Sequence, residues 1–368
     1  MYKQILRPIL FKGDPERVHN TTLLIGRFIG ASGLSQLLRK RFVFKDKRLE
    51  NEVMGIKFEN PVGLSAGFDK NAQLIEIIPD IGFGFMEVGS ITAEPCLGNL
   101  KPRLHRLTKD KGIIVNYGLA NNGSVKIYNE LKNKKVRIPL AISIAKTNNP
   151  LIKGDLSVDD YFKTFELMKG IGNFIVINIS CPNVGDGRSF EDPILLKKLL
   201  KKIDKIRKNE IILLKLSPDI NNKNLDEIIK LAQTYKINGF IISNLTKKRE
   251  NLSEDKNLRY PGGISGKPVK NKSNNLIKEI YKKTKGRFVI IGSGGIFSGK
   301  DAYEKIKNGA SLVQLITGMI YEGPGIIKKI NKELVELMKK DGYKNIKEVI
   351  GENARWQRKI MKITLWLL

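Results

Sequence analysis

Residues that build disulfide frameworks and metal centres are scarce in this chain, which has two cysteines and two histidines among 368 residues. Two cysteines in a chain of this length do not form a disulfide framework, so we expect a reducing compartment. His19 and His105 lie far from each other and from any Cys/Asp pattern, so we expect no metal site. No segment reaches the roughly 18 uninterrupted apolar residues of a membrane span, and the N-terminus lacks a signal-peptide pattern.

Acidic residues are also few, since 37 Asp and Glu stand against 66 Lys and Arg, a net charge of +29. Such a charge is typical of proteins that bind nucleic acid. However, the lysines of Lys197-Lys198-Leu-Leu-Lys201-Lys202 alternate with apolar residues, as on the solvated face of an amphipathic helix. The sequence also has no zinc-finger, helix-turn-helix or RNA-recognition signature. We therefore expect no nucleic-acid partner and favour attraction to an anionic membrane or substrate.

Strand-like and helix-like segments alternate along most of the chain, which is 41% hydrophobic and can bury a large core. The pattern predicts an α/β protein with a (β/α)8 TIM barrel over residues 46–340, and an open, doubly wound sheet is the alternative. The stretch 92–120 is too long for a simple loop and is predicted to form an insertion over the barrel mouth. The predicted strands are 61–68, 83–91, 139–146, 174–181, 211–218, 239–244, 287–294 and 312–318, and helix-length segments include 190–208, 222–236, 268–285 and 299–309.

Two segments flank the predicted barrel. In residues 1–45 a helix begins at Asp14-Pro15, and apolar residues then recur at mostly helical spacing from Val18 to Leu38, with glycines that suggest a break. We predict an amphipathic helical pair that either docks on the protein itself or lies on a membrane surface. Residues 341–368 are predicted to form a C-terminal tail, which packs on the barrel or extends the membrane-facing patch.

The predicted strand 174–181 ends in a cluster of polar and reactive side chains. Its first residues, Phe174–Ile177, are typical of a strand buried on both faces of a parallel sheet, and Asn178, Cys181 and Asn183 follow. A strand that ends in this way delivers amide and thiol groups to one point, as barrel strands do for catalysis. The alternative is a buried strand followed by an ordinary polar loop.

Glycine-rich turns follow the seventh and eighth predicted strands, in Gly292-Ser-Gly-Gly295 and in Thr317-Gly318. Loops at this place form the usual phosphate site of such barrels, and glycines let backbone N–H groups approach phosphate oxygens. Lys215 lies in the middle of an apolar strand and would be costly inside the barrel without an anionic partner. A phosphorylated cofactor would supply that partner. The alternative is a structural lysine paired with a buried carboxylate.

At this point the sequence resembles the dihydroorotate dehydrogenase family over roughly residues 14–340. Asp14–His19 and the helices after it are similar to the N-terminal extension of the membrane-associated, quinone-reducing class. The resemblance implies an FMN-bearing barrel that oxidises (S)-dihydroorotate to orotate in pyrimidine synthesis and passes electrons to a quinone. It also implies peripheral attachment to the cytoplasmic side of the cell membrane, with a cytoplasmic location as the alternative. The motifs are Ala66-Gly67-Phe68-Asp69-Lys70, Gly82-Phe83-Gly84-Phe85, Val88-Gly89-Ser90-Ile91-Thr92, Asn178-Ile-Ser-Cys-Pro-Asn183, Gly262-Gly-Ile-Ser-Gly266 and Gly309-Ala-Ser-Leu-Val-Gln314.

By matching positions, the resemblance implies a role for each site residue. Cys181 falls at the place of the base, which takes a proton from C5 of dihydroorotate while a hydride leaves C6 for N5 of the flavin. His19 and Arg106 match residues on the quinone path. The positions implied to bind substrate are Lys70, Asn116, Tyr117, Gly118, Leu119, Asn178, Asn183 and Asn244. The positions implied to bind FMN are Ala66, Gly67, Lys70, Ser90, Ser143, Asn178, Lys215, Ser243, Ser265, Gly266, Gly294, Gly295, Leu315, Thr317 and Gly318.

Several positions depart from the pattern of the quinone-reducing class. Its base is usually serine, whereas cysteine is typical of the soluble class. The asparagine of Val115-Asn116-Tyr117-Gly118 stands one place late, and Ser143 replaces an asparagine beside the flavin. Leu245 replaces a threonine near orotate, and Ile316 replaces a tyrosine near the quinone tunnel. The alternatives are therefore a soluble-type dehydrogenase using fumarate or another acceptor, a relative acting on another cyclic amide, and a basic barrel that binds membrane or nucleic acid without redox chemistry.

Overall fold

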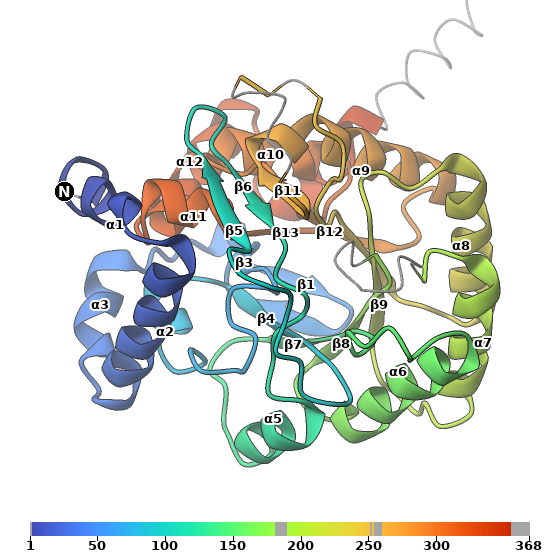
Figure 1. Ribbon diagram of the computed structural model, residues 1–368. Helices are drawn as coiled ribbons and strands as arrows, with labels where there is room; N and C mark the ends of the chain where they lie inside the picture. Colours follow the sequence, from blue (N-terminus) through green and yellow to red (C-terminus); the bar gives the residue numbers. More distant parts are fainter. Residues whose placement is uncertain (1, 181–189, 251, 254–259, 355–368) are drawn as a thin grey trace, which may run out of the picture.

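The computed structural model describes residues 2–180, 190–250, 252–253 and 260–354, and within them eight parallel strands form a closed barrel (Figure 1). The strands pair in the order in which they occur along the chain, and the last pairs with the first. Each predicted strand segment contains one barrel strand, so the predicted (β/α)8 barrel is confirmed and the open-sheet alternative is wrong. The strands are β3 (Val62–Leu64), β4 (Phe85–Ile91), β7 (Leu140–Ile144), β8 (Phe174–Asn178), β9 (Ile212–Leu216), β10 (Gly239–Ile242), β12 (Val289–Ser293) and β13 (Leu312–Leu315).

The barrel is buried because helices cover its outer face. Every residue of β8 and β9 is buried, as the continuous apolar runs predict. In α7, Leu196, Leu199 and Ile203 are buried at helical spacing, whereas the four lysines of this helix are exposed or half-exposed, as predicted. The helices around the barrel are α5 (Ser124–Leu131), α6 (Asp155–Met168), α7 (Pro193–Asp204), α8 (Asn222–Thr234), α9 (Lys270–Thr284, after the 3-10 turn Lys267–Val269), α10 (Gly299–Lys307), α11 (Thr317–Glu322) and α12 (Ile326–Lys340).

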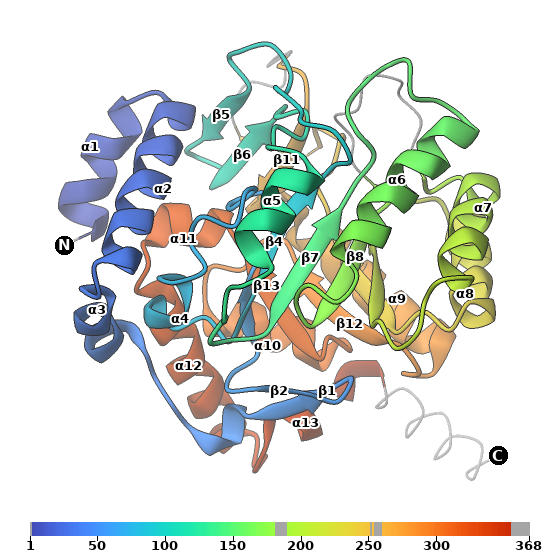
Figure 2. The same ribbon diagram turned by 90° about the horizontal axis from the view of Figure 1, so that it is seen from below.

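Helices α2 (Pro15–Ala31) and α3 (Ser35–Phe42) lie in the region where a helical pair is predicted, at one side of the barrel (Figure 2). Asp14 caps α2 by accepting a hydrogen bond of 2.8 Å from the N–H of Arg17. A π-helical turn, η1 (Tyr2–Leu6), and a short helix, α1 (Arg7–Lys12), precede the pair and are not apparent in the sequence.

Helix α2 presents two different faces. A Cβ on Gly26 would lie 2.7 Å from Cδ2 of Leu74, and one on Gly30 would lie 3.0 Å from Cβ of Glu76. These two glycines therefore allow the helix to pack closely on the segment before α4 (Ile78–Ile81). Away from this contact, Leu24 and Phe28 are each 69% exposed. None of the described helices is long and apolar enough to cross a membrane.

The predicted insertion contains a hairpin of β5 (Leu104–Leu107) and β6 (Gly112–Val115). β6 also pairs with β11 (Gly263–Gly266), which makes a three-stranded antiparallel sheet at the carboxyl end of the barrel strands. At the opposite end, the hairpin of β1 (Asn51–Val53) and β2 (Ile56–Phe58) packs against the first residues of the barrel strands (Figure 2). The remaining elements are η2 (Lys47–Leu49) and α13 (Ile346–Val349).

Candidate active site

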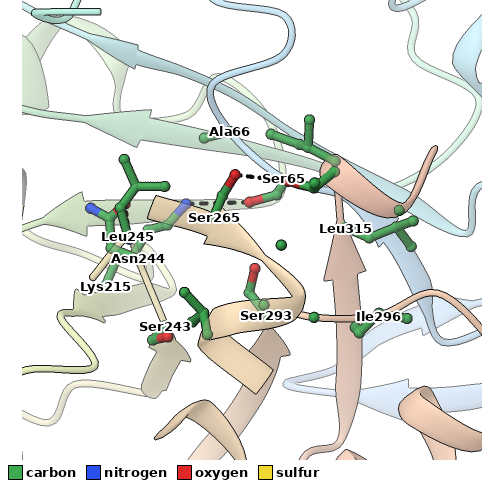
Figure 3. Close-up of a pocket in the computed structure, with 17 residues that line it drawn as sticks. Ser65, Ala66, Lys215, Ser243, Asn244, Leu245, Ser265, Ser293, Ile296 and Leu315 are labelled. Carbon is green, nitrogen blue, oxygen red and sulfur yellow. Dashed lines mark hydrogen bonds between the residues drawn. The ribbon is translucent and has the colours of Figure 1, made fainter. Parts of the chain in front are cut away.

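The carboxyl ends of the strands surround a cavity (Figure 3). The space free of protein atoms between them is about 510 Å³, part of which is open to solvent. Ser65, Ser243 and Ser293 lie at the ends of three different strands and face the same space. The lining residues are Ser65, Ala66, Lys215, Ser243, Asn244, Leu245, Ser265, Gly266, Val269, Ser293, Gly294, Gly295, Ile296, Leu315, Ile316, Thr317 and Gly318.

Most of the positions predicted to bind the cofactor line this cavity, while Gly67, Lys70, Asn178, Ser90 and Ser143 do not. The two serines lie 3.0 Å apart at their Oγ atoms. Nδ2 of Asn178 donates to Oγ of Ser90 over 2.9 Å, and Nδ2 of Asn244 donates to Oδ1 of Asn178 over 3.2 Å. A chain of hydrogen-bonded side chains therefore connects the ends of β4, β7 and β8 to the rim of the cavity.

Glycines form one wall of the cavity where only glycine fits. Gly266, Gly294 and Gly295 have φ of +91°, +99° and +73°. A Cβ on Gly266 would lie 2.4 Å from the carbonyl oxygen of Lys111, and one on Gly295 would lie 2.8 Å from Cα of Lys270. The backbone itself therefore forms the wall here, and its N–H groups are accessible to an anionic oxygen.

Three hydroxyl groups complete this side of the cavity. Oγ of Ser243 is buried and has no hydrogen-bond partner among the described residues. Because a buried hydroxyl without a partner is costly, Ser243 fits a site whose ligand supplies that partner. Oγ of Ser265 and Oγ1 of Thr317 lie 2.8 Å apart, across the ends of β11 and β13. The cavity can thus bind an anionic, oxygen-rich group next to the glycine turns.

Lys215 lines the cavity but does not lack a protein partner. Its Nζ lies 3.2 Å from Oε2 of Glu87, whose side chain is fully buried in β4. The same carboxylate accepts hydrogen bonds from the N–H of Ala66 and from Nε2 of Gln314, over 3.1 and 2.9 Å. Lys215 therefore needs no anionic cofactor to pair its charge, contrary to the prediction, because Glu87 is a buried carboxylate of the kind named as the alternative. The sequence analysis missed Glu87, although a single acid inside a buried strand is a signal for such a pair.

Lys70, Tyr117 and His19 form a second group, between the barrel and α2. Nζ of Lys70 lies 3.8 Å from the centroid of the Tyr117 ring, in a cation–π contact. Burial lowers the pKa of Lys70 to about 8. The ring of His19 packs edge-on against Phe68, with centroids 5.0 Å apart, and its Nε2 is buried without a partner among the described residues. Burial, and then the charge of Lys70, lower the pKa of His19 to about 3, so its imidazole is neutral.

The displaced asparagine of the 115–119 segment is directed away from the cavity. Oδ1 of Asn116 accepts a hydrogen bond of 2.9 Å from Nδ2 of Asn99, in the insertion. Gly118 adopts φ of +67° and Leu119 adopts φ of +57°. Of the five residues from Val115 to Leu119, none lines the cavity, and only Tyr117 contacts the lysine predicted to bind substrate.

Two arginines of the insertion hold the N-terminal helices. Nη2 and Nε of Arg103 lie 2.7 and 3.0 Å from the carboxylate oxygens of Glu16, at the start of α2. The guanidinium of Arg103 also lies 4.5 Å from the centroid of the Tyr117 ring. Arg106 donates to the carbonyl oxygens of Leu10, Phe11 and Gly13, at the end of α1. Arg106 therefore contacts the N-terminal segment, and Arg103, which the sequence analysis missed, lies next to Tyr117.

Cys181 and Asn183, predicted as base and substrate ligand, lie outside the described residues. Ser180 is the last described residue before them. Its Oγ lies 3.2 Å from Nδ2 of Asn244, next to Asn178. The chain therefore enters the segment 181–189 at the rim of the cavity.

Together, the barrel and a cavity with a glycine wall, buried amides and a lysine at its carboxyl end define a TIM-barrel enzyme that binds an anionic ligand. A family model described as Dihydroorotate dehydrogenase matches residues 48–338. The chain belongs to the dihydroorotate dehydrogenase family. This finding confirms the resemblance and shows that the alternative of a barrel without redox chemistry is wrong.

Relatives and solved structures agree with this membership. The chain is 44% identical over 342 residues to the dihydroorotate dehydrogenase (quinone) of Christiangramia forsetii, with 91% of this chain and 99% of the relative covered. The protein of the same name from Trichodesmium erythraeum is 39% identical over 376 residues, with 95% and 98% covered. The ferulenol complex of the Eimeria tenella enzyme superposes with a TM-score of 0.80 at 30% identity, covering 93% of this chain and 96% of that chain. Its ligand-free form gives 0.78 at 30% identity, covering 89% and 98%.

Proposed function

We propose that this chain oxidises dihydroorotate to orotate in pyrimidine synthesis, with FMN as its cofactor and a membrane quinone as its electron acceptor. The observation that carries the cofactor is the glycine wall beside the unpartnered hydroxyl of Ser243. The names of the relatives, dihydroorotate dehydrogenase (quinone), support the substrate and the acceptor.

The lining residues support FMN as the ligand at both ends of the cavity. Gly294, Gly295, Ser265 and Thr317 would bind the phosphate through backbone N–H and hydroxyl groups. Lys215, held by Glu87, would donate to the polar edge of the flavin ring. When bound, FMN supplies the acceptor for the hydride that leaves C6 of the substrate.

Asn178 and Asn244 would orient the substrate ring, and the hydrogen bond between their amides at the rim of the cavity supports this role. Lys70, the cation of the second group, would bind the carboxylate of the substrate. Cys181 would take the proton from C5. A thiol with a reference pKa near 8.5 is a better base at neutral pH than an alcohol, so a cysteine suits this role.

The N-terminal segment supports a quinone acceptor and peripheral attachment to the cytoplasmic side of the cell membrane. The exposed large apolar residues of this segment lie on neighbouring helices and include Leu24, Ile25, Phe28 and Leu37. His19, from the same helix as the first three, carries a neutral, unpartnered nitrogen at the side of Tyr117 and Lys70. A quinone that enters along α2 would reach this nitrogen before the barrel. Residues 1–45 would thus serve as the membrane and quinone-access unit of the barrel formed by residues 46–340.

A soluble-type enzyme that uses fumarate is the second candidate. Two residues favour it: Cys181 at the place of the base, and Ile316, which lines the cavity where the quinone-reducing class has tyrosine.

One assay separates the two candidates and tests the cofactor. The purified full-length protein is tested for bound FMN by absorbance and for dihydroorotate oxidation with a long-chain quinone analogue, fumarate and NAD side by side. We expect stoichiometric FMN and the highest kcat/KM with the quinone. Preference for fumarate would replace the proposed acceptor, and a colourless protein that cannot be reconstituted with FMN would overturn the assignment of the cofactor.

A further inference from the structure

Lys305, in α10, is a buried cation that the proposed catalysis does not use. Its side chain is completely buried, and its methylene groups pack beneath Gly292 of β12, where a Cβ would lie 3.2 Å from Cδ of Lys305. Within the described residues, no carboxylate lies at ion-pair distance from its Nζ. The nearby acids Asp301 and Glu304 are paired with Lys270 instead, over 2.7 and 3.0 Å.

The hydrogen bonds of Lys305 lead toward the glycine wall of the cavity. Nζ donates to Oγ of Ser273 over 2.9 Å and to Oδ1 of Asn274 over 2.8 Å, both in the first turn of α9. Oγ of Ser273 in turn donates to the carbonyl oxygen of Ser293 over 2.6 Å. Ser293 lines the cavity and directly precedes the two glycines of the turn. One side chain therefore separates the ammonium group from the backbone of the turn.

A full positive charge in this position is costly without a nearby anion. Burial lowers the pKa of Lys305 to about 7. A phosphate bound on the other side of the Gly294–Gly295 turn would be the missing anion. The ammonium group of Lys305 thus lies on the far side of the Gly294–Gly295 turn from the cavity and would act on a bound anion without contacting it.

We propose that Lys305 is a positioning residue for the phosphate of the cofactor: its charge raises the affinity for the anion from behind the turn, and its bond to Ser273 fixes the turn itself. The inference rests on the proposed FMN site. It concerns the phosphate alone, because the flavin ring would lie toward Lys215 and Glu87, at the other end of the cavity. The competing explanation is a purely structural tie between α9 and α10, which would not distinguish a phosphorylated from an unphosphorylated flavin.

The test compares FMN with riboflavin, which lacks the phosphate. The full-length protein is freed of flavin, and the dissociation constants of both flavins are measured by quenching of flavin fluorescence. In Lys305→Met we expect the affinity for FMN to fall about tenfold, as loss of one charge near a phosphate implies, while the affinity for riboflavin stays within about twofold. Inorganic phosphate should raise the melting temperature of the flavin-free wild type and not that of the variant.

Lys307→Met is the matched control, because it removes the same charge from the same helix at a partly exposed position. It should change neither dissociation constant. Ser273→Ala keeps the charge and removes the bond to the turn, so we expect a smaller loss of FMN affinity, and this variant also serves as the test if Lys305→Met does not fold. If Lys305→Met leaves the ratio of the two dissociation constants unchanged, because it weakens both flavins equally or neither, Lys305 does not position the phosphate. A wild type that binds FMN no better than riboflavin would instead overturn the proposed phosphate site.

Discussion

Nζ of Lys215 lies 3.2 Å from Oε2 of Glu87; both side chains are buried, and Lys215 lines the cavity. The pair neutralises two charges inside the barrel, and in the proposed site Lys215 would also donate a hydrogen bond to the flavin. Mutation can separate these two effects. Lys215→Ala leaves the carboxylate of Glu87 without its cation.

We expect Lys215→Ala to lower the free energy of unfolding of the flavin-free protein by about 3 kcal/mol, because an uncompensated buried charge remains. It should also bind little FMN. The double variant Lys215→Met with Glu87→Gln should recover most of the stability but not the FMN affinity. Urea denaturation and flavin titration measure the two effects, and full flavin occupancy in Lys215→Ala would contradict the assigned contact.

Cys181→Ala should retain FMN but slow the reduction of flavin by dihydroorotate by about 100-fold or more, the usual effect of losing a general base. Cys181→Ser should keep part of the rate, since the hydroxyl can replace the thiol less effectively. Stopped-flow absorbance of the flavin measures the rate. If the alanine variant reduces flavin as fast as the wild type, another residue is the base.

Binding of orotate should weaken as the pH rises above about 8. Burial lowers the pKa of Lys70 to about 8, so the free enzyme loses this charge above that pH, whereas the bound carboxylate requires the protonated lysine. The dissociation constant should then rise by up to about tenfold per pH unit, because binding takes up one proton. Titration of flavin absorbance with orotate between pH 7 and 9 measures this, and Lys70→Gln should bind weakly at every pH.

The exposed apolar face of α2 should mediate both membrane binding and quinone turnover. Deletion of residues 1–45 is a poor test, because it removes Glu16 and leaves Arg103 half-paired inside the protein. We expect Leu24→Ser with Phe28→Ser to weaken binding to anionic lipid vesicles by at least about tenfold, from the loss of apolar area. Flavin reduction by dihydroorotate should be unchanged, and turnover with a long-chain quinone should fall.

Ile194→Ser is the control for this double variant. Ile194 is 70% exposed on α7, which lies across the barrel from α2 (Figure 1). Vesicle binding should also decrease with salt, since the proposed attachment is peripheral and the chain carries a net charge of +29. If both surface variants reduce quinone equally well, α2 does not guide the quinone.

The barrel could be predicted from the sequence because each of its strands is an apolar run between amphipathic segments, and such a run is restricted to few folds. The glycine wall could also be predicted, because Gly294 and Gly295 directly follow a predicted strand at a place where barrels bind phosphate. In both cases the information is local in the sequence.

Pairs that are distant along the chain could not be predicted. Glu87 and Lys215 are separated by 128 positions, and Glu16 and Arg103 by 87. The residues that flank one member of a pair do not indicate which residue is its partner. The six residues of α1 are too few for a period to be recognised, and Arg106 fixes their carbonyl end from outside the segment. Lys305 looks like any surface lysine of an amphipathic helix, and only packing shows that it is buried.

The sheet of β5, β6 and β11 connects the N-terminal segment with the cavity. One edge carries Arg106 and so holds the end of α1, and the other carries Ser265 and Gly266 of the cavity. The end of α1 and one wall of the cavity are therefore connected through three hydrogen-bonded strands, so that a displacement of β6 would move both together.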